Sequence, residues 1–282
     1  MNRRPEQGAE KGPRLGAKAD KLKAIAEAVN HDGLRRLTAA RRLAQRLSRQ
    51  LLRLAFESAY PPTCVLCGAA GFGELDLCLG CLADLPDVAP SCERCALPLP
   101  AGTPDGIVCG KCQRQPPAYD RCIALFRYQG AVARLVGDFK FRQRLHLGRL
   151  FGQLLAEAAR WQPDASLPDL LVPVPLHPSR LRQRGYNQSL EVARVAGRAL
   201  GIDADRSGVE RVVATPPQLT LAREERQSNV RNAFRVRRPL MARHVAIIDD
   251  VVTTGATVGE LARVLRQAGA ERVDVWAVAR TP

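Results

Sequence analysis

Eight cysteines in four CxxC pairs, all within residues 61–118, constrain this chain more than any other feature. The pairs are Cys64/Cys67, Cys78/Cys81, Cys92/Cys95 and Cys109/Cys112. A two-residue gap lets a tight turn point both sulfurs at one ion, and four thiolates complete a tetrahedral zinc site. The segment has few large apolar side chains, so it needs a metal ion or a covalent cross-link to fold. We therefore predict two structural Zn²⁺ ions, with disulfides or an iron–sulfur cluster as the alternatives.

The pairing of these ligands is open. The first two pairs can hold one ion and the last two the other, and a cross-braced arrangement satisfies the same chemistry. Four ligands per site leave no open coordination position, which favours structure over catalysis. The ninth cysteine, Cys122, lies in an apolar stretch and is predicted to be a buried packing residue.

The charge of the chain is unevenly distributed. The 282 residues carry a formal net charge of +15, which favours polyanionic partners such as nucleic acid, an anionic membrane or phosphorylated metabolites. Residues 61–120 hold three Lys/Arg against seven Asp/Glu, whereas residues 121–282 hold 26 against 15. Because zinc–thiolate centres add negative charge, we expect the cysteine segment to be structural or to dock a partner rather than to bind phosphates.

The residues before the cysteines form two segments. Residues 1–33 are a polar, basic tail that we predict to be disordered. Residues 34–60 predict an amphipathic basic helix, because apolar residues recur at three- and four-residue spacing from Leu37 to Leu54 and seven arginines lie between Leu34 and Leu54. Its apolar stripe is typical of a helix docked on the protein, or alternatively of one bound to a membrane surface or partner. With no uncharged apolar run near about 18 residues and no signal-peptide pattern, we expect no transmembrane segment and a cytoplasmic location.

Residues 119–282 alternate between strand and helix patterns. Strands are predicted over 122–126, 170–174, 209–214, 244–248 and 272–278. Helices are predicted over 131–160, with a break around Gln143, and over 187–200 and 257–269. This alternation predicts an α/β domain with a mainly parallel, twisted sheet flanked by helices.

The run from Val245 to Thr257 carries the most chemistry. A buried apolar strand is followed by Asp249 and Asp250 at its carboxyl end, where ligands bind in open α/β sheets. A Thr/Gly turn then opens a helix, so its backbone N–H groups can converge on one phosphate. This phosphate loop consists of Thr253, Thr254, Gly255, Ala256 and Thr257. The adjacent carboxylates suit a diol or a Mg²⁺ shell about one ribose length away from that phosphate.

An arginine-rich segment between residues 172 and 188 is the second candidate site. Arg180, Arg182 and Arg184 stand at alternate positions on what we predict to be a proline-stiffened loop. Their forked donors suit a diphosphate. The alternative is a solvated basic surface loop. His177 is predicted to fix the loop rather than to catalyse.

The run 245–257 resembles the signature with which type I phosphoribosyltransferases bind phosphoribosyl pyrophosphate (PRPP). The order of a basic helix, PPxCxxCG, Phe139-Lys140-Phe141, VPVP…RGYNQ and then this signature is similar to the ComF/GntX family over roughly residues 45–282. The resemblance implies a small Cys-rich double zinc ribbon over 61–118, followed by a type I phosphoribosyltransferase fold over 119–282. It also implies that the acidic pair contacts the ribose hydroxyls and that the loop holds the 5-phosphate.

Two classes of function follow from this resemblance. The first is a phosphoribosyltransferase, a glycosyltransferase for pentosyl transfer, that uses Mg²⁺ with PRPP. Its catalytic residues would be Asp249, Asp250, Arg180 and Arg184. Its substrate-binding residues would be Thr253, Thr254, Gly255, Ala256, Thr257, Arg182 and Lys140. Lys140, or a residue in 218–234, would close over the site.

The second class is a non-catalytic protein that binds PRPP and DNA during DNA import. The family links this chain to natural competence, and so to single-stranded DNA, to other competence proteins such as a helicase or channel, and to the periphery of the inner membrane. Basic clusters at 134–149 and 223–238 favour phosphate contact, whereas 13 aromatic residues are few for a broad base-stacking platform. A nucleotide-salvage enzyme unrelated to competence is the remaining alternative.

Overall fold

The computed structural model describes residues 61–162, 166–213 and 230–282. The chain divides into two compact units, Met1–Pro61 and Pro62–Pro282. The predicted tail (1–33) and amphipathic helix (34–60) therefore lie outside the described residues. The cysteine segment and the α/β part both belong to the second unit, and the boundary between residues 118 and 119 stays a prediction. Within the described ranges, every helix is too short or too polar to span a membrane.

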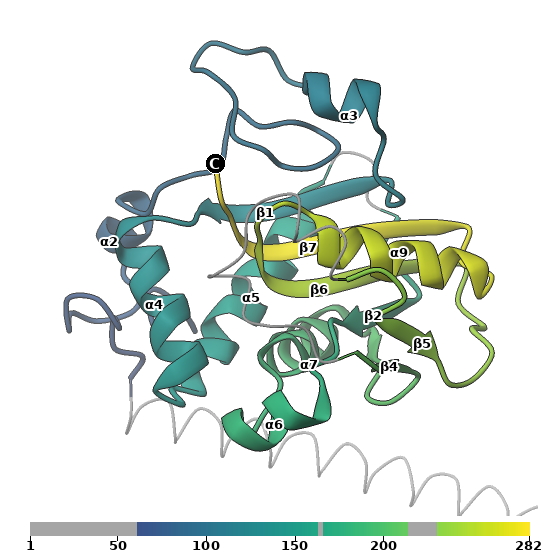
Figure 1. The fold of residues 1–282 in the computed structure, drawn as a ribbon. Coiled ribbons are helices and arrows are strands. Elements are labelled where there is room, and N and C mark those ends of the chain that lie inside the picture. Colours follow the sequence, from purple (N-terminus) through teal and green to yellow (C-terminus); the bar gives the residue numbers. More distant parts are fainter. Residues whose placement is uncertain (1–60, 163–165, 214–229) are drawn as a thin grey trace, which may run out of the picture. The chain divides into compact units, whose positions relative to one another are not determined.

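Five parallel strands form the central sheet of the second unit (Figure 1). In spatial order they are β1 (Arg121–Arg127), β7 (Arg272–Arg280), β6 (His244–Val252), β2 (Leu170–Pro173) and β3 (Asp203–Ala204). The central strands β6 and β7 are nearly continuous apolar runs, which is typical of parallel strands covered on both faces. The predicted α/β fold class is confirmed.

Helices cover the sheet on both faces. Helices α4 (Gly130–Phe141), α5 (His146–Arg160) and α7 (Gln188–Leu200) pack on one face, and α9 (Ala256–Gln267) packs on the other. Alternate residues of β6 separate accordingly: Ala246 and Ile248 join the first cluster, whereas Val245 and Ile247 join the second. The strand's period of two therefore builds one core on each side of the sheet.

Local signals fix several element ends as predicted. The break expected around Gln143 separates α4 from α5, and Gln143 itself adopts a left-handed φ of 55°. Asn187 caps α7, because its side chain accepts a hydrogen bond from the Leu190 N–H at 3.3 Å. The strand predicted at 209–214 is only β4 (Val209–Arg211), which pairs antiparallel with β5 (Phe234–Val236) outside the central sheet.

The prediction of an arginine-rich loop is wrong, because the residues from Pro178 to Arg184 form helix α6. Pro178 occupies the first turn, where its missing N–H costs nothing. The Nδ1 atom of His177 accepts from the Ser179 N–H at 3.3 Å, so His177 caps a helix instead of fixing a loop. Gly185 ends the helix in the left-handed conformation, with φ of 84°.

The cysteine segment contacts both faces of the sheet. Its first half contains α2 (Leu79–Ala83), and Cys64 and Leu77 of this half join the cluster formed with α4 and α5. Its second half contains α3 (Gly110–Arg114), and its four cysteines join the cluster formed with α9. Figure 1 shows α2 close to α4 and α3 well apart from it. The two halves therefore support opposite sides of the sheet.

Candidate functional site

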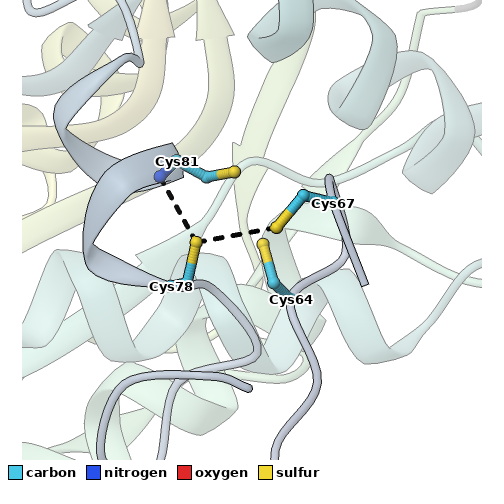
Figure 2. Close-up of side chains that lie close together, drawn as sticks. All are labelled: Cys64, Cys67, Cys78 and Cys81. Carbon is cyan, nitrogen blue, oxygen red and sulfur yellow. Dashed lines mark hydrogen bonds between the residues drawn. The ribbon is translucent and has the colours of Figure 1, made fainter. Parts of the chain in front are cut away.

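Two groups of four cysteines bring their sulfur atoms together. In each group the sulfurs all lie within 4.8 Å of one another. The first group is Cys64, Cys67, Cys78 and Cys81, and the second is Cys92, Cys95, Cys109 and Cys112. Figure 2 shows the first group, with the four side chains pointing toward a common centre. The ligands are thus paired sequentially rather than cross-braced.

The sulfur spacing fits zinc. The Sγ atoms of Cys67 and Cys78 are 3.7 Å apart, and those of Cys95 and Cys109 are 3.8 Å apart. A regular tetrahedron with a Zn–S distance of about 2.3 Å has sulfurs about 3.8 Å apart, whereas a disulfide would bring them to about 2.05 Å. All nine cysteines are free thiols. Both groups are therefore four-cysteine zinc-binding sites.

The local backbone favours the thiolate at one ligand of each site, whereas the pKa values of Cys81, Cys95 and Cys112 are raised in the absence of an ion. Burial raises the pKa of Cys64, but hydrogen bonds from the backbone of Cys78, Cys67 and Leu66 outweigh it and lower the pKa to about 6. Burial is likewise outweighed at Cys109, whose pKa falls to about 7. The ninth cysteine, Cys122, is buried in β1, and burial raises its pKa to about 12. Its predicted role as a packing residue is confirmed.

A cavity of about 590 Å³ lies at the carboxyl ends of β2 and β6. It gathers side chains from the end of β6, the start of α9, the end of α4, helix α6 and strand β4. The predicted site residues that line it are Lys140, Arg180, Arg184, Asp249, Asp250, Thr253, Gly255, Ala256 and Thr257. The structure therefore places the two motifs predicted from the sequence in one continuous cavity.

The acidic pair closes the buried strand β6. Asp250 is buried, and one of its carboxylate oxygens lies 3.0 Å from the Nζ atom of Lys140 on α4. Asp249 is half-buried, accepts from its neighbour's N–H at 2.9 Å, and accepts from the Ser189 hydroxyl at 3.4 Å. Burial, followed by the charge of Asp250, raises the pKa of Asp249 to about 7. The pair is therefore poised to gain stability from a cation or a hydrogen-bond donor.

The phosphate loop joins β6 to α9. Gly255 precedes the helix with φ of 80°, a conformation that favours glycine. A Cβ atom built there would lie 3.3 Å from the Tyr119 hydroxyl, so the loop also passes close to a buried side chain. Thr254 is not among the residues that line the cavity, and its hydroxyl accepts from the Ala256 N–H at 3.3 Å. Thr254 thus shapes the turn, whereas its predicted role as a direct ligand contact stays untested.

Helix α6 places two of the three predicted arginines in the lining of the cavity. Arg180 and Arg184 are four residues apart, so they share a helix face, and both line the cavity. Arg182 is not among the lining residues, because a two-residue step on a helix points a side chain to another side. The guanidinium of Arg184 also lies 5.4 Å from the ring centre of Phe141. The loop prediction had treated the three arginines as equivalent.

Sequence reasoning missed Arg211. This residue of β4 is buried, lines the cavity, and lies 5.6 Å from the ring centre of Phe234. Burial, followed by the charge of Arg180, lowers the pKa of Arg211 from its ordinary value. The only sequence signal was a charge within an apolar strand, which is equally typical of a solvated edge. Arg180, Arg184 and Arg211 together make this side of the cavity cationic.

Comparison with known proteins identifies the family. A family model described as a double zinc ribbon domain matches residues 55–113. The DNA utilization protein YhgH of Escherichia coli is 35% identical over 225 residues, which cover 78% of this chain and 98% of that protein. Competence protein F of Haemophilus influenzae is 32% identical over 224 residues, which cover 77% of this chain and 96% of that protein. The chain belongs to the ComF family.

More distant similarity extends the ComF comparison. Competence protein ComFC of Streptococcus pneumoniae is 27% identical over 157 residues, which cover 56% of this chain and 67% of that protein. A solved structure of glutamine phosphoribosylpyrophosphate amidotransferase from B. subtilis, complexed with ADP and GMP, is 22% identical. It covers 46% of this chain and 25% of its own, with a TM-score of 0.32. At that TM-score the likeness carries no weight, and the fold class follows from this chain's own strand order.

Proposed function

We propose that this ComF-family chain binds PRPP in the cavity at the carboxyl ends of β2 and β6, as a phosphoribosyltransferase-like protein that acts in the handling of single-stranded DNA. The observation that carries the proposal is the convergence of three charged features on one cavity of about 590 Å³. These features are the acidic pair, the phosphate loop and the arginines of α6 and β4. Ligand pockets typically have volumes of about 300–1,000 Å³, and PRPP has three polar parts of matching charge.

Each part of PRPP has a matching group. The N–H groups of the phosphate loop, residues 253–257, would bind the 5-phosphate, since this loop opens α9 and a helix N-terminus favours negative charge. The carboxylates of Asp249 and Asp250 would accept hydrogen bonds from the ribose hydroxyls. Arg180 and Arg184 would donate to the diphosphate through forked, charge-assisted hydrogen bonds.

The transfer itself needs charge stabilisation at the leaving group. A nucleophile would form a bond to the ribose C1 as the C1–O bond to diphosphate breaks, and the electron pair leaves with the diphosphate. Arg180 and Arg184 stabilise that departing charge. Mg²⁺, when bound, supplies further neutralisation of the diphosphate, and the carboxylate oxygens of the acidic pair are the donor type it prefers. Lys140, now 3.0 Å from Asp250, is released when another cation or donor takes that carboxylate, and it can then close over the phosphates.

A second candidate function is PRPP and DNA binding without turnover. Among the described residues that line the cavity, the carboxylates are Asp249 and Asp250, both of which the proposal assigns to the ribose. No described carboxylate in the lining is then left to act as a base toward an acceptor. This observation favours a non-catalytic binding protein over a nucleotide-salvage enzyme.

Calorimetry with the full chain and PRPP, with and without Mg²⁺, tests the binding. We expect Mg²⁺-dependent binding, and its absence would overturn the proposal. Pyrophosphate release in the presence of nucleobases or amines then separates the candidates. Release with a nucleobase supports salvage, release with an amine supports another transferase, and binding without release with either class supports the second candidate.

The DNA part of the proposal draws on the relatives' names and on a basic rim beside the cavity. The ring of Phe141 is 70% exposed at the end of α4, and Arg184 lies over it. The side chains of Arg142 and Arg144 are 72% and 48% exposed. Aromatic rings beside exposed guanidinium groups suit a base and its backbone phosphates. We propose that single-stranded DNA contacts this rim, while helicase or channel partners and peripheral attachment to the inner membrane remain further parts of the proposal.

The other predicted basic cluster is less suited to DNA. Residues 223–229 lie outside the described ranges. Arg238 lies 2.9 Å from the buried Asp205, and Arg237 lies 3.6 Å from Glu210. These side chains already hold together the segment around β4 and β5. Arg142 and Arg144 are paired as well, with Asp138 at 3.4 and 3.3 Å, so ion pairing alone does not separate the two clusters. The rim at residues 141–144 is the better DNA candidate because the exposed Phe141 lies beside these arginines and lines the cavity.

A further inference from the structure

The second zinc-binding site, formed by Cys92, Cys95, Cys109 and Cys112, is hydrogen-bonded to the back of the phosphate loop. Lys111 stands between two of these ligands, and its Nζ atom donates to the Thr254 carbonyl at 3.4 Å. Arg280, at the end of β7, donates from Nε to the carbonyl of the ligand Cys95 at 3.0 Å. Two side chains thus link the zinc-binding site to the strand–loop junction.

Arg280 reaches the loop as well. Its Nη1 atom donates to the Val252 carbonyl at 3.1 Å and to the Thr253 carbonyl. Its side chain is buried, and its partners include backbone carbonyls of the zinc-binding segment, of the loop and of the adjacent Thr281. Hydrogen bonds from a charged donor are stronger than neutral ones, and breaking them would leave a buried charge without partners. Arg280 is therefore a firm cross-link.

Because the peptide bond is planar, hydrogen bonds to the loop's carbonyls also fix the direction of its N–H groups. In a trans peptide the N–H points opposite to the C=O of the same peptide plane. The carbonyls of Val252, Thr253 and Thr254 are held from the zinc side. The N–H groups of residues 253, 254 and 255 must then point away from the zinc-binding site. These N–H groups belong to the loop that the proposed function assigns to the 5-phosphate.

We infer that Lys111 and Arg280 make the second zinc-binding site a positioning element for the phosphate loop, so that zinc there and a phosphate ligand at the loop strengthen each other's binding. This inference rests on the proposed function for its ligand. The first zinc-binding site packs on the opposite face of the sheet with α4 and α5, so it takes no part in this coupling. Coupling between two sites is reciprocal, so either ligand reports on it.

The first test needs no phosphate ligand. Hydrogen exchange of residues 249–260 is compared between the full chain, Lys111→Ala and Arg114→Ala, all loaded with two zinc ions. Arg114 is a matched control, because it is an exposed basic residue of the same helix α3 without a described hydrogen bond to residues 252–254. We expect faster exchange in the loop only for Lys111→Ala, with β7 and α7 unchanged. Equal exchange in all three proteins would overturn the inference.

The second test uses PRPP with Mg²⁺ as the probe and zinc release to a chromogenic chelator as the readout. Saturating PRPP should slow the release of one of the two zinc ions by roughly fivefold, which is the low end of the coupling usually found between two sites, and should leave the other unchanged. Lys111→Ala should lose most of this protection, whereas Arg114→Ala should keep it. PRPP binding with no change in zinc release would overturn the coupling.

These experiments separate failure of the inference from failure of the proposed function. If calorimetry finds no PRPP binding, the proposed function fails, and loop exchange in Lys111→Ala still decides whether the zinc-binding site positions the loop. Arg280→Lys provides a second variant, because it keeps the charge but cannot reach all three carbonyls. We expect it to speed loop exchange more than Lys111→Ala, and slow exchange in a folded Arg280→Lys protein would contradict the cross-link.

Discussion

At the scale of single residues, the acidic pair is the part of the candidate site whose charge is least compensated. Two carboxylates lie at the end of one buried strand, and Lys140 is the described cation in ion-pair contact with them, through Asp250. Among the described residues, Asp249 accepts from a backbone N–H and a serine hydroxyl, and its pKa is raised to about 7. A ligand that brings hydroxyl donors or a cation would relieve both groups at once.

Replacing the acidic pair should weaken PRPP binding. Asp249→Asn with Asp250→Asn removes the acceptor charge while keeping the shape of both side chains. We expect at least a ~10-fold loss of affinity, since hydrogen bonds to charged groups are each worth about 1.5–3 kcal/mol. Calorimetry on the folded double variant measures it. Unchanged affinity would refute the site, and Asp274→Asn, far from the cavity at the other end of the sheet, is not expected to change it.

The raised pKa of Asp249 predicts how stability depends on pH. The folded value of about 7 lies above the unfolded value of about 3.9, so the folded protein binds more protons between these values. Stability from this group is therefore fully present below about pH 4 and is lost as the pH rises through 7. Asp249→Asn lacks this loss, so we expect its Tm to exceed that of the natural chain by a few degrees more at pH 8 than at pH 5. Thermal unfolding at both pH values measures the difference, and a constant gap would contradict the prediction.

At the scale of elements, α6 decides which arginines serve the cavity. As a helix it turns Arg180 and Arg184 to one face and Arg182 away from them. Its position directly after β2 places that face over the carboxyl end of the sheet. The helix thus presents two guanidinium groups to the cavity from one face, whereas the predicted loop would have presented all three.

Arg180→Ala and Arg182→Ala should therefore differ. We expect Arg180→Ala to weaken PRPP binding by about 10-fold and Arg182→Ala to stay within about twofold, since only the first loses charge-assisted contacts to the diphosphate. Ribose 5-phosphate lacks the diphosphate and should bind both variants equally. Calorimetry with both ligands measures the two losses. Equal losses of PRPP affinity for the two variants would contradict the prediction that α6 directs Arg180, but not Arg182, toward the diphosphate.

The sequence predicted most of the sheet and nine of the residues that line the cavity, for identifiable physical reasons. The strands at β1, β6 and β7 and the cap at Asn187 depend on local patterns that survive in the fold. Helix α6 was missed because Pro178 is compatible with both a loop and a first helical turn. Arg211 was missed because its burial depends on β4 folding back beside the cavity. The contact between Lys111 and Thr254 joins residues distant in the chain, which no local pattern encodes.

At the scale of the whole molecule, the two zinc-binding sites brace opposite faces of one sheet. The first packs with α4 and α5, and the second with α9. We therefore expect the folded unit Pro62–Pro282 to depend on both ions, although among the described residues only the second site is hydrogen-bonded to the phosphate loop. Metal content and fold are expected to be linked throughout this unit.

Purified protein should contain two zinc ions per chain. Elemental analysis measures the ratio, and iron, or no metal in a soluble monomer, would contradict it. The ion of the first site should leave first on chelation, because Cys67 is exposed whereas all four ligands of the second site are buried. Release in two phases is the expected result, with circular dichroism showing most of the loss of structure in the second phase.

Single-stranded DNA should bind with a steep dependence on salt. The logarithm of the affinity is expected to fall by about 0.7 per logarithmic unit of salt for each phosphate contacted. Arg142→Ala with Arg144→Ala should flatten that slope by about 1.4, since it removes two exposed cations from the rim. Arg243→Ala is the matched control, because its side chain is 78% exposed but precedes β6 at the opposite end of the strand. Filter binding at three salt concentrations decides, and an equal effect of the control would argue against the rim.

The position of β7 has a consequence for how the protein is made. β7 follows every other described strand in the chain, yet it lies between β1 and β6 and pairs Arg121 with Asp274. A ribosome therefore delivers β1 long before its neighbour exists. The ligands of each zinc-binding site, in contrast, span only 18 and 21 residues. A nascent chain can thus capture its metal early, whereas the cavity can form only after translation has passed the last strand.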